Sequence, residues 1–338
     1  MKKIITVLFL TSLSKFSYSQ NTTVNNDTLR LFLNNVFLTI QQNSVYKSSF
    51  DWTDLKMKVF KGIDTAKCYD DLIPAIKSIY QSTKDKHGAV YLNGKRIAMN
   101  DKPTFTIRKV LQDQFKNGIP KIKTQILENK YGYILIPGNN AFGENSSTLS
   151  QQIQDSLCKL NLKNLRGLII DLRLNTGGSM YPMLCGLNEI VGNGMIGSFA
   201  DLNGKPITKW IIGSGAFYLD TQRIAVVHNL CRFPKYFKVV VLLSQITSSA
   251  GEDLTVALKG RPNTLFIGEK TSGYTTSTSV HYVNGQLLTV SNAFIADRTG
   301  KVYYENIPPD LEITNGDDFD DLAFDTKVIA ALKWMKNH

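Results

Sequence analysis

The sequence predicts an α/β fold in which a helical region precedes a core of alternating strands and helices. Short apolar runs rich in Val, Ile and Leu alternate with amphipathic segments from about residue 131 onward. Such runs are typical of buried strands, and their alternation with helices indicates a layered α/β architecture. A chain of 338 residues, 43% of them hydrophobic, is also long enough to bury a large core.

The first twenty residues, MKKIITVLFLTSLSKFSYSQ, have the layout of a cleavable secretory signal. Two lysines precede an apolar stretch at residues 4–10, and small residues follow at Ser17 and Ser19. That stretch is too short to span a bilayer, and no later segment is apolar for long enough. We therefore predict a signal peptide over residues 1–19, no integral membrane segment, and export to the periplasm or the extracellular space. An uncleaved N-terminal anchor is the alternative.

Three helical patterns follow between Asp27 and about Tyr80, in LRLFLNNVFLTI, DWTDLKMKVFKGI and YDDLIPAIKSIYQST. Apolar residues recur every three or four positions in them, which places these residues on one helix face. We assign residues 20–95 to an N-terminal helical region and residues 96–338 to the core. Core strands are expected at 131–138, 167–173, 238–244 and 264–269, helices at 180–191 and 252–258, a hairpin at Asn284-Gly285, and a closing helix whose start the aspartates of GDDFDD favour.

Charge and cysteine content exclude several classes of function. The formal net charge of +11 comes from scattered basic residues without interleaved aromatics, so no nucleic-acid groove is expected. The cysteines form no CxxC pair, and no His or Cys pair has the spacing of metal ligands, so we expect neither a metal nor a cofactor. Cys158 and Cys185 lie in apolar helical patterns and are expected to be buried thiols; the pairing of the four cysteines stays open. These are Cys68, Cys158, Cys185 and Cys231.

Hydroxyl side chains gather in SQITSSAGEDL, between an apolar run and a helix expected from about Glu252. Ser249 precedes Ala250 and Gly251, small residues that let a substrate approach the backbone. Free N–H groups and the helix dipole favour a developing anion there. Serine and threonine are also ordinary capping residues, and spacing alone does not rank Thr247, Ser248 and Ser249.

Two further features could complete a serine-based site. The strand end IIDLRLNTGGSM carries Gly177 and Gly178, whose backbone amides could bind an oxyanion or could form a simple strand-to-helix turn. His87, in STKDKHGAVYL, stands where a helix gives way to a strand and could serve as a base or be an ordinary surface histidine. The sequence has neither a GxSxG elbow nor a Walker A spacing, which disfavours an α/β-hydrolase and a nucleotide-binding enzyme.

In order, these pieces resemble the C-terminal processing (tail-specific) and tricorn-core family of serine peptidases. The resemblance rests on DWTDL, DKH, GLIIDLRLNTGG, TSSAGEDLTVALKGRPNTLFIGEKTSG and YYENIPPDLEI. It implies a ClpP/crotonase-like core, Ser249 as nucleophile, and an oxyanion hole formed by the N–H of Ala250 with that of Gly177 or Gly178. It also implies that Glu252 starts the helix and takes no direct part in catalysis.

The family divides over the general base. The resemblance places Tyr274 where the processing branch has a catalytic lysine. Lys270 is nearby, but it aligns with a proline of the family and not with that lysine. The tricorn-like branch uses a histidine from a D-x-H segment and an orienting glutamate, which implies His87 and Glu305. Lys86 replaces a serine of that branch, and its charge is expected to lower the pKa of His87.

The stretch between Arg96 and Lys123 is too short for the PDZ domain that many relatives insert. The resemblance therefore implies an exported serine endopeptidase that cleaves peptides or proteins through an acyl-enzyme, without a PDZ groove. The alternatives are a catalytically silent protein of the same fold that carries a hydrophobic ligand or peptide, and a Ser-Lys enzyme using Lys270. Residues 192–237 are expected either to wall the substrate cleft or to form a surface loop, and the oligomeric state stays open.

Overall fold

The computed structural model describes residues 24–92, 94–98, 106–161, 164–231, 234 and 237–337. The predicted signal peptide at residues 1–19 lies outside the described residues. The chain divides into two compact units, each with its own apolar core. The division into residues 20–95 and 96–338 remains a prediction.

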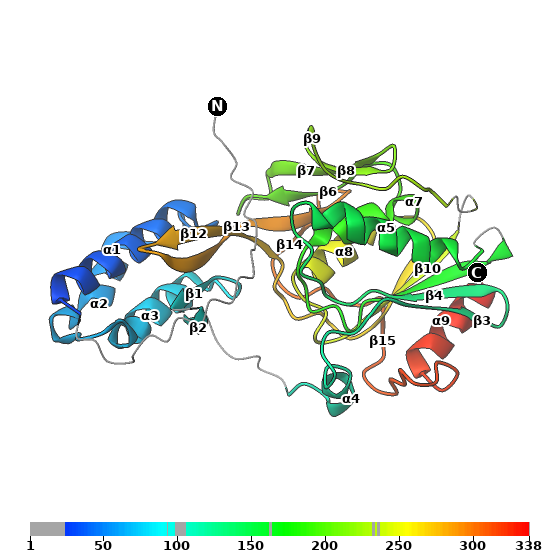
Figure 1. Ribbon diagram of the computed structural model, residues 1–338, viewed down its shortest axis with the longest axis horizontal. Coiled ribbons are helices and arrows are strands. Elements are labelled where there is room, and N and C mark those ends of the chain that lie inside the picture. The colour runs from blue at the N-terminus through cyan, green and yellow to red at the C-terminus, as the bar shows by residue number, and fades with distance from the viewer. Residues whose placement is uncertain are drawn as a thin grey trace. The chain divides into compact units, whose positions relative to one another are not determined.

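The first unit joins the N-terminal helices to a hairpin from late in the chain (Figure 1). One apolar cluster contains Phe32 and Tyr80 from the helices and Leu288 from the hairpin. The three helices confirm the helical patterns of the sequence. The elements are α1 (Asn26–Asn43), α2 (Trp52–Phe60), η1 (Ile63–Thr65), η2 (Tyr69–Leu72), α3 (Ile73–Thr83), β1 (Ala89–Leu92), β2 (Lys95–Ala98), β12 (Thr276–Val283) and β13 (Gln286–Asp297), of which residues 286–294 belong here.

The hairpin of β12 and β13 turns at Asn284 and Gly285, as the sequence predicts. Their φ angles are 49° and 77°, in the left-handed region that a two-residue hairpin turn of type I′ requires. Strand β13 pairs antiparallel with β12 on one side and with β1 on the other. The hairpin therefore supplies strands to the part of a nine-stranded sheet on which α1, α2 and α3 pack.

The second unit contains a six-stranded sheet in the order β15-β11-β10-β5-β4-β3. All neighbouring pairs are parallel except β3 with β4. Parallel strands end at the same edge of a sheet, so the segments that follow β4, β5 and β10 meet there. These strands are β3 (Lys123–Leu127), β4 (Tyr131–Leu135), β5 (Gly167–Asp171), β10 (Lys238–Leu243), β11 (Thr264–Gly268) and β15 (Leu311–Glu312).

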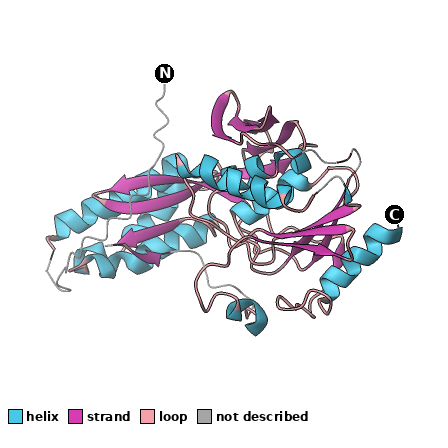
Figure 2. Cartoon of the chain, turned by 45° about the vertical axis from the view of Figure 1, so that its right-hand side comes forward, coloured by secondary structure: helices cyan, strands magenta, loops and turns pink. Residues whose placement is uncertain are grey.

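Helices cover both faces of this sheet, which confirms the predicted α/β fold (Figure 2). Ile169 of β5 faces the cluster that includes α9, and its neighbour Ile170 faces the cluster that includes α5, α6 and α8. Successive strand residues point to opposite faces, so two buried faces produce continuous apolar runs. The helices are α4 (Lys109–Asp113), α5 (Asn145–Cys158), α6 (Met180–Gly186), α7 (Asn188–Val191), α8 (Ala250–Leu258) and α9 (Thr326–Asn337).

The segment before β10 forms antiparallel strands in the order β6-β7-β8-β9. Trp210 and Phe217 anchor them in the same apolar cluster as α6, so this part of the segment is built into the core and is no loose surface loop. The strands are β6 (Gly194–Ala200), β7 (Pro206–Gly213), β8 (Ala216–Leu219) and β9 (Gln222–Val226); β14 (Val302–Tyr303) pairs with the end of β13.

A disulfide joins Cys158, the last residue of α5, to Cys231, which follows β9. The expectation of a buried thiol is therefore wrong for Cys158, because the end of α5 brings its Cα to 5.5 Å from that of Cys231. The same expectation is confirmed for Cys185, which is free and buried.

Two expected helix boundaries are wrong. The helix expected at 180–191 breaks at Leu187, where the Asn188 amide donates to the Cys185 carbonyl over 2.6 Å and competes with helical pairing. The aspartates of GDDFDD do not start the last helix, because Asp317 instead pairs with buried cations and Asp325 caps the helix. No helix among the described residues is long and apolar enough to cross a membrane.

Candidate active site

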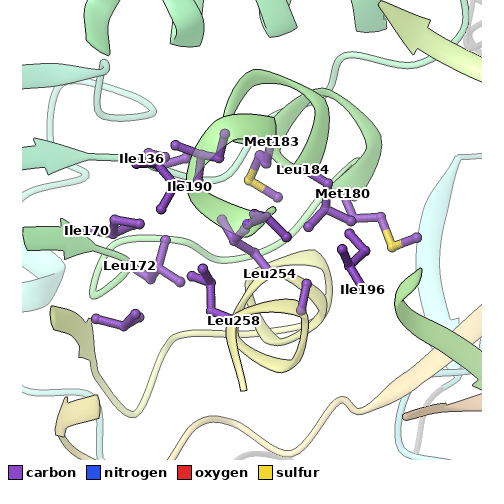
Figure 3. Packing of buried hydrophobic residues seen from close by; sticks show 14 of the residues in the cluster. Ile136, Ile170, Leu172, Met180, Met183, Leu184, Ile190, Ile196, Leu254 and Leu258 are labelled. Carbon is purple, nitrogen blue, oxygen red and sulfur yellow. The ribbon is translucent and has the colours of Figure 1, made fainter. Parts of the chain in front are cut away.

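Ser249 stands at the N-cap of α8, directly after the loop that follows β10. Its backbone angles, φ 52° and ψ −119°, are costly for a residue with a Cβ, by about 1–3 kcal/mol. The surroundings hold it there: its N–H donates to the Glu252 carboxylate over 2.9 Å, and its carbonyl accepts the N–H of Asp253 over 3.0 Å. Figure 3 shows Leu254 and Leu258 anchoring the same helix beside Ile170 and Leu172.

Glu252 is fully buried and does more than start the helix. Besides Ser249, it accepts from the Thr271 hydroxyl over 2.5 Å and from the N–H groups of Gly273 and Tyr274 over 2.8 Å each. Burial raises the pKa of Glu252 to about 7, although these four donors favour its ionised form. The carboxyl therefore ties the loop after β11 to the backbone of Ser249.

The turn after β5 brings Gly177 next to Ser249. A Cβ on Gly177 would lie 2.9 Å from the Ser249 Cβ, so only glycine fits. The Gly177 N–H donates to Asn175 Oδ1 over 3.1 Å, and its carbonyl accepts the N–H of Asn139 over 3.0 Å. Both groups of Gly177 are therefore engaged within the turn.

Gly178 differs, because its N–H donates to no acceptor among the described residues. Since a peptide unit is planar and trans, this N–H points opposite to the Gly177 carbonyl, which faces Asn139 after β4. Strand β10 lies on the other side of β5, so the N–H points toward the side from which Ser249 comes. Ala250, the first residue of α8, likewise has an uncommitted N–H in the described part of the chain.

The remaining hydroxyls of SQITSSAGEDL hold this loop to the end of β5. The buried Thr247 hydroxyl donates to the Leu172 carbonyl over 2.8 Å, and that of Ser244 donates to the Arg173 carbonyl over 2.6 Å. The Ser248 N–H donates to the Asn175 carbonyl. Of the three hydroxyls that the sequence left unranked, that of Thr247 is therefore structural, and so is the hydroxyl of Ser244.

His87 lies in the first unit and is oriented there. Its Nδ1 is 2.8 Å from the Thr276 carbonyl, which only accepts, so Nδ1 carries the proton and Nε2 is the basic nitrogen. Burial lowers the pKa of His87, whereas Lys86 is exposed and its charge is not among the causes of the shift. The predicted direction of the shift is therefore confirmed, but the predicted cause is wrong.

Asp85, in the DKH motif, has a role that was not predicted from the sequence. This buried carboxylate accepts from the N–H groups of His87 and Gly88 and from both the N–H and the hydroxyl of Ser291. It fixes the backbone that carries the imidazole. An aspartate two residues before a histidine at a turn is the signal that could have found it.

Glu305 and Lys270 belong to the second unit, and both side chains are exposed. Glu305 precedes Ile307, whose N–H donates to the Thr271 hydroxyl over 2.8 Å. Thr271 is itself bound to Glu252, so the backbone two residues after Glu305 is connected to this network. Among the described residues, no group of three or more His, Cys, Asp or Glu side chains could hold a metal ion.

The family model of peptidase family S41 matches residues 130–313, a range that includes the glycine turn, Ser249 and Glu305. The chain belongs to peptidase family S41. This confirms the predicted resemblance, and every strand of the six-stranded sheet except β3 lies within the matched residues.

Individual relatives agree with this assignment. The nisin-resistance protein of Lactococcus lactis subsp. lactis is 25% identical over 300 residues, which span 87% of this chain and 82% of that protein. A lipoprotein from Streptococcus agalactiae has the same fold, with a TM-score of 0.64, 20% identity, and coverage of 94% of this chain and 98% of that one. The photosystem II D1 C-terminal processing protease has a TM-score of 0.53 at 15% identity, covering 85% of this chain and 93% of that one.

Proposed function

We propose that this member of family S41 is an exported serine endopeptidase that hydrolyses peptide bonds through an acyl-enzyme, with Ser249 as nucleophile. The observation that carries the proposal is the strained backbone of Ser249 at the start of α8, together with the N–H groups of Ala250 and Gly178, which donate to no acceptor among the residues that the structure describes. Strain of this kind is typical of catalytic positions, where the surrounding bonds maintain it. These two N–H groups form the oxyanion hole, with Gly178 favoured over Gly177 because the Gly177 N–H is already engaged.

In the proposed reaction the Ser249 hydroxyl attacks the peptide carbonyl and passes its proton to Nε2 of His87. The Thr276 carbonyl holds the opposite ring nitrogen protonated, which supports the role of Nε2 as the base. The imidazolium then protonates the leaving amine, and water hydrolyses the acyl-enzyme. Glu305 is assigned as the acidic partner that favours the imidazolium.

A fluorophosphonate probe tests the nucleophile, because it forms a covalent bond with an activated serine. Wild-type protein should label, and Ser249→Ala should not, while circular dichroism shows that both are folded. Equal labelling of both, or none of the folded wild type, would refute the peptidase and favour a protein that carries a hydrophobic ligand or peptide. His87→Ala should abolish labelling and Lys270→Ala should retain it; the reverse would identify a Ser-Lys enzyme.

Export rests on separate observations. The N-terminal layout is that of a secretory signal, and a disulfide joins Cys158 to Cys231, a bond that persists in oxidising compartments. We assign the mature protein to the periplasm or the extracellular space, with peptides or proteins as substrates. N-terminal sequencing of the protein released from producing cells should give Gln20 as the first residue, and an intact Met1 would contradict the signal peptide.

A further inference from the structure

Asp253 is an acidic side chain one helical turn beyond the nucleophile. Its N–H donates to the Ser249 carbonyl over 3.0 Å, so Asp253 stands in the first turn of α8, directly after the N-cap residue Ser249. Side chains of a helix lean toward its N-terminus, which directs the Asp253 carboxyl back toward Ser249. Every other residue of α8 is buried, whereas Asp253 keeps part of its surface exposed.

No counter-charge lies beside this carboxyl in the part of the chain that the structure describes. Among the described residues it forms neither a hydrogen bond nor an ion pair, in contrast to the neighbouring Glu252 with its four donors. Burial, and then the charge of Glu252, raise the pKa of Asp253 well above its usual range. An unpaired, desolvated acid lowers stability, and such costs are typically retained where function requires them.

Helix α6, which follows the glycine turn, carries an aromatic side chain that Asp253 influences. Tyr181 comes three residues after Gly178, and its ring lies 5.6 Å from that of Phe217 at an angle of 30°. Burial and then the charge of Asp253 raise the pKa of the Tyr181 hydroxyl, so the phenol lies within the electrostatic reach of the carboxyl. Helices α6 and α8 share one apolar cluster; α6 begins directly after the glycine turn, and α8 begins directly after Ser249.

We propose that Asp253 determines specificity by pairing with a basic side chain, lysine or arginine, on the substrate residue whose carbonyl Ser249 attacks. This inference rests on the proposed peptidase function and names its substrate class. The residue that supplies the scissile carbonyl is held by Ser249 and the oxyanion hole, and Ser249 and Ala250 stand at the N-terminal end of the helix that carries Asp253. A cation reaching the carboxyl gives it the partner that the described residues do not supply, and a charge-assisted hydrogen bond in a partly buried setting favours binding about 10-fold or more.

The test compares two diphenyl phosphonates that modify activated serines. One carries the lysine side chain at the reacting position, and the other carries norleucine, which has the same straight chain without the ammonium group. The ratio of their second-order inactivation rate constants, lysine over norleucine, should be about 10 or more for the wild type. It should fall to about 1 in Asp253→Asn and below 1 in Asp253→Lys. Glu144→Gln, which removes one exposed negative charge at the start of α5, is the matched control and should keep the wild-type ratio.

Each outcome bears on the inference. A wild-type ratio near or below 1 overturns it, as does a ratio in Asp253→Asn equal to that of the wild type. Asp253→Asn should also unfold at the same temperature as the wild type or higher, because it removes a desolvated acid; a lower temperature would assign Asp253 a structural role instead. Labelling of wild type by fluorophosphonate, measured first, separates failure of this inference from failure of the peptidase proposal.

Discussion

Replacing Glu252 by glutamine should change the stability of the protein in a pH-dependent way. The amide is best placed with its NH2 toward Thr271, whose hydroxyl can rotate to accept from it, while its oxygen keeps the bond to the Ser249 N–H. The Gly273 N–H then loses its acceptor, which costs about 1–3 kcal/mol for a buried donor. This loss is independent of pH.

The Glu252 carboxyl also makes a contribution to the free energy of unfolding that depends on pH. Its pKa rises from 4.5 in the unfolded chain to about 7 in the folded one. The folded state therefore binds the proton more tightly, so this group stabilises the protein below pH 4.5 and loses that contribution as the pH rises to 7. A shift of that size corresponds to about 3 kcal/mol. Glutamine does not titrate, so it lacks this pH-dependent contribution to the free energy of unfolding. Glu252→Gln should therefore destabilise by about 1–3 kcal/mol at pH 5 and be neutral or stabilising at pH 8.5.

Urea unfolding at pH 5 and at pH 8.5, followed by circular dichroism, measures both values. The informative quantity is the difference between the two pH values, because the orphaned N–H contributes equally to each. Glu144→Gln, at an exposed position, should change stability little at either pH. If Glu252→Gln has the same effect at both pH values within about 1 kcal/mol, or is more destabilising at pH 8.5, the account of the buried carboxyl is wrong.

Four further outcomes follow from the geometry. Gly178→Ala would place a Cβ 1.6 Å from the Asn139 carbonyl oxygen, so fluorophosphonate labelling should fall about 100-fold or more, whereas Gly213→Ala, with open space around it, should not affect the rate. Cys231→Ser opens a disulfide that spans 73 residues and should lower the free energy of unfolding by up to about 4 kcal/mol, measured in urea without reductant. Asp317→Asn leaves the buried Arg173 and Lys327 short of a counter-charge and should destabilise by about 3–5 kcal/mol in the same assay; a loss below about 1 kcal/mol would contradict the ion pairs. Because burial lowers the pKa of His87, the labelling rate should reach half its maximum at a pH below about 6.5, and a midpoint above that value would contradict its role as the base.

Periodicity and turn chemistry were enough to predict much of the fold. Continuous apolar runs identified the parallel strands because both sheet faces are buried, and Asn284-Gly285 identified the hairpin because its turn needs two positive φ angles. The start of the last helix was mispredicted because Asp317 serves Arg173, which is distant in the sequence. No local pattern reveals a partner of that kind.

The candidate site was predictable where single segments carry the chemistry. Ser249 and the glycine turn were predicted in this way. The choice between Gly177 and Gly178 was not, because it depends on the hydrogen bond that the Gly177 N–H donates to the Asn175 side chain. Glu252 looked like an ordinary helix-start residue because its partners Thr271, Gly273 and Tyr274 come from a loop about twenty residues away. Asp253 gives no signal in the sequence, because an unpaired acid on a helix is usually exposed.

The first unit is built from two segments that are far apart in the sequence, and this determines when during synthesis the unit can fold. The Thr276 carbonyl that orients the His87 imidazole is 189 positions later in the chain, and Leu288, which packs with α1, α2 and α3, is later still. A ribosome releases the chain from its N-terminus, so the three helices emerge long before the strands that cover their apolar face. A nascent or truncated chain that ends before the hairpin has the histidine but not the carbonyl that sets its tautomer. The imidazole therefore acquires its orientation only when nearly the whole protein has been synthesised.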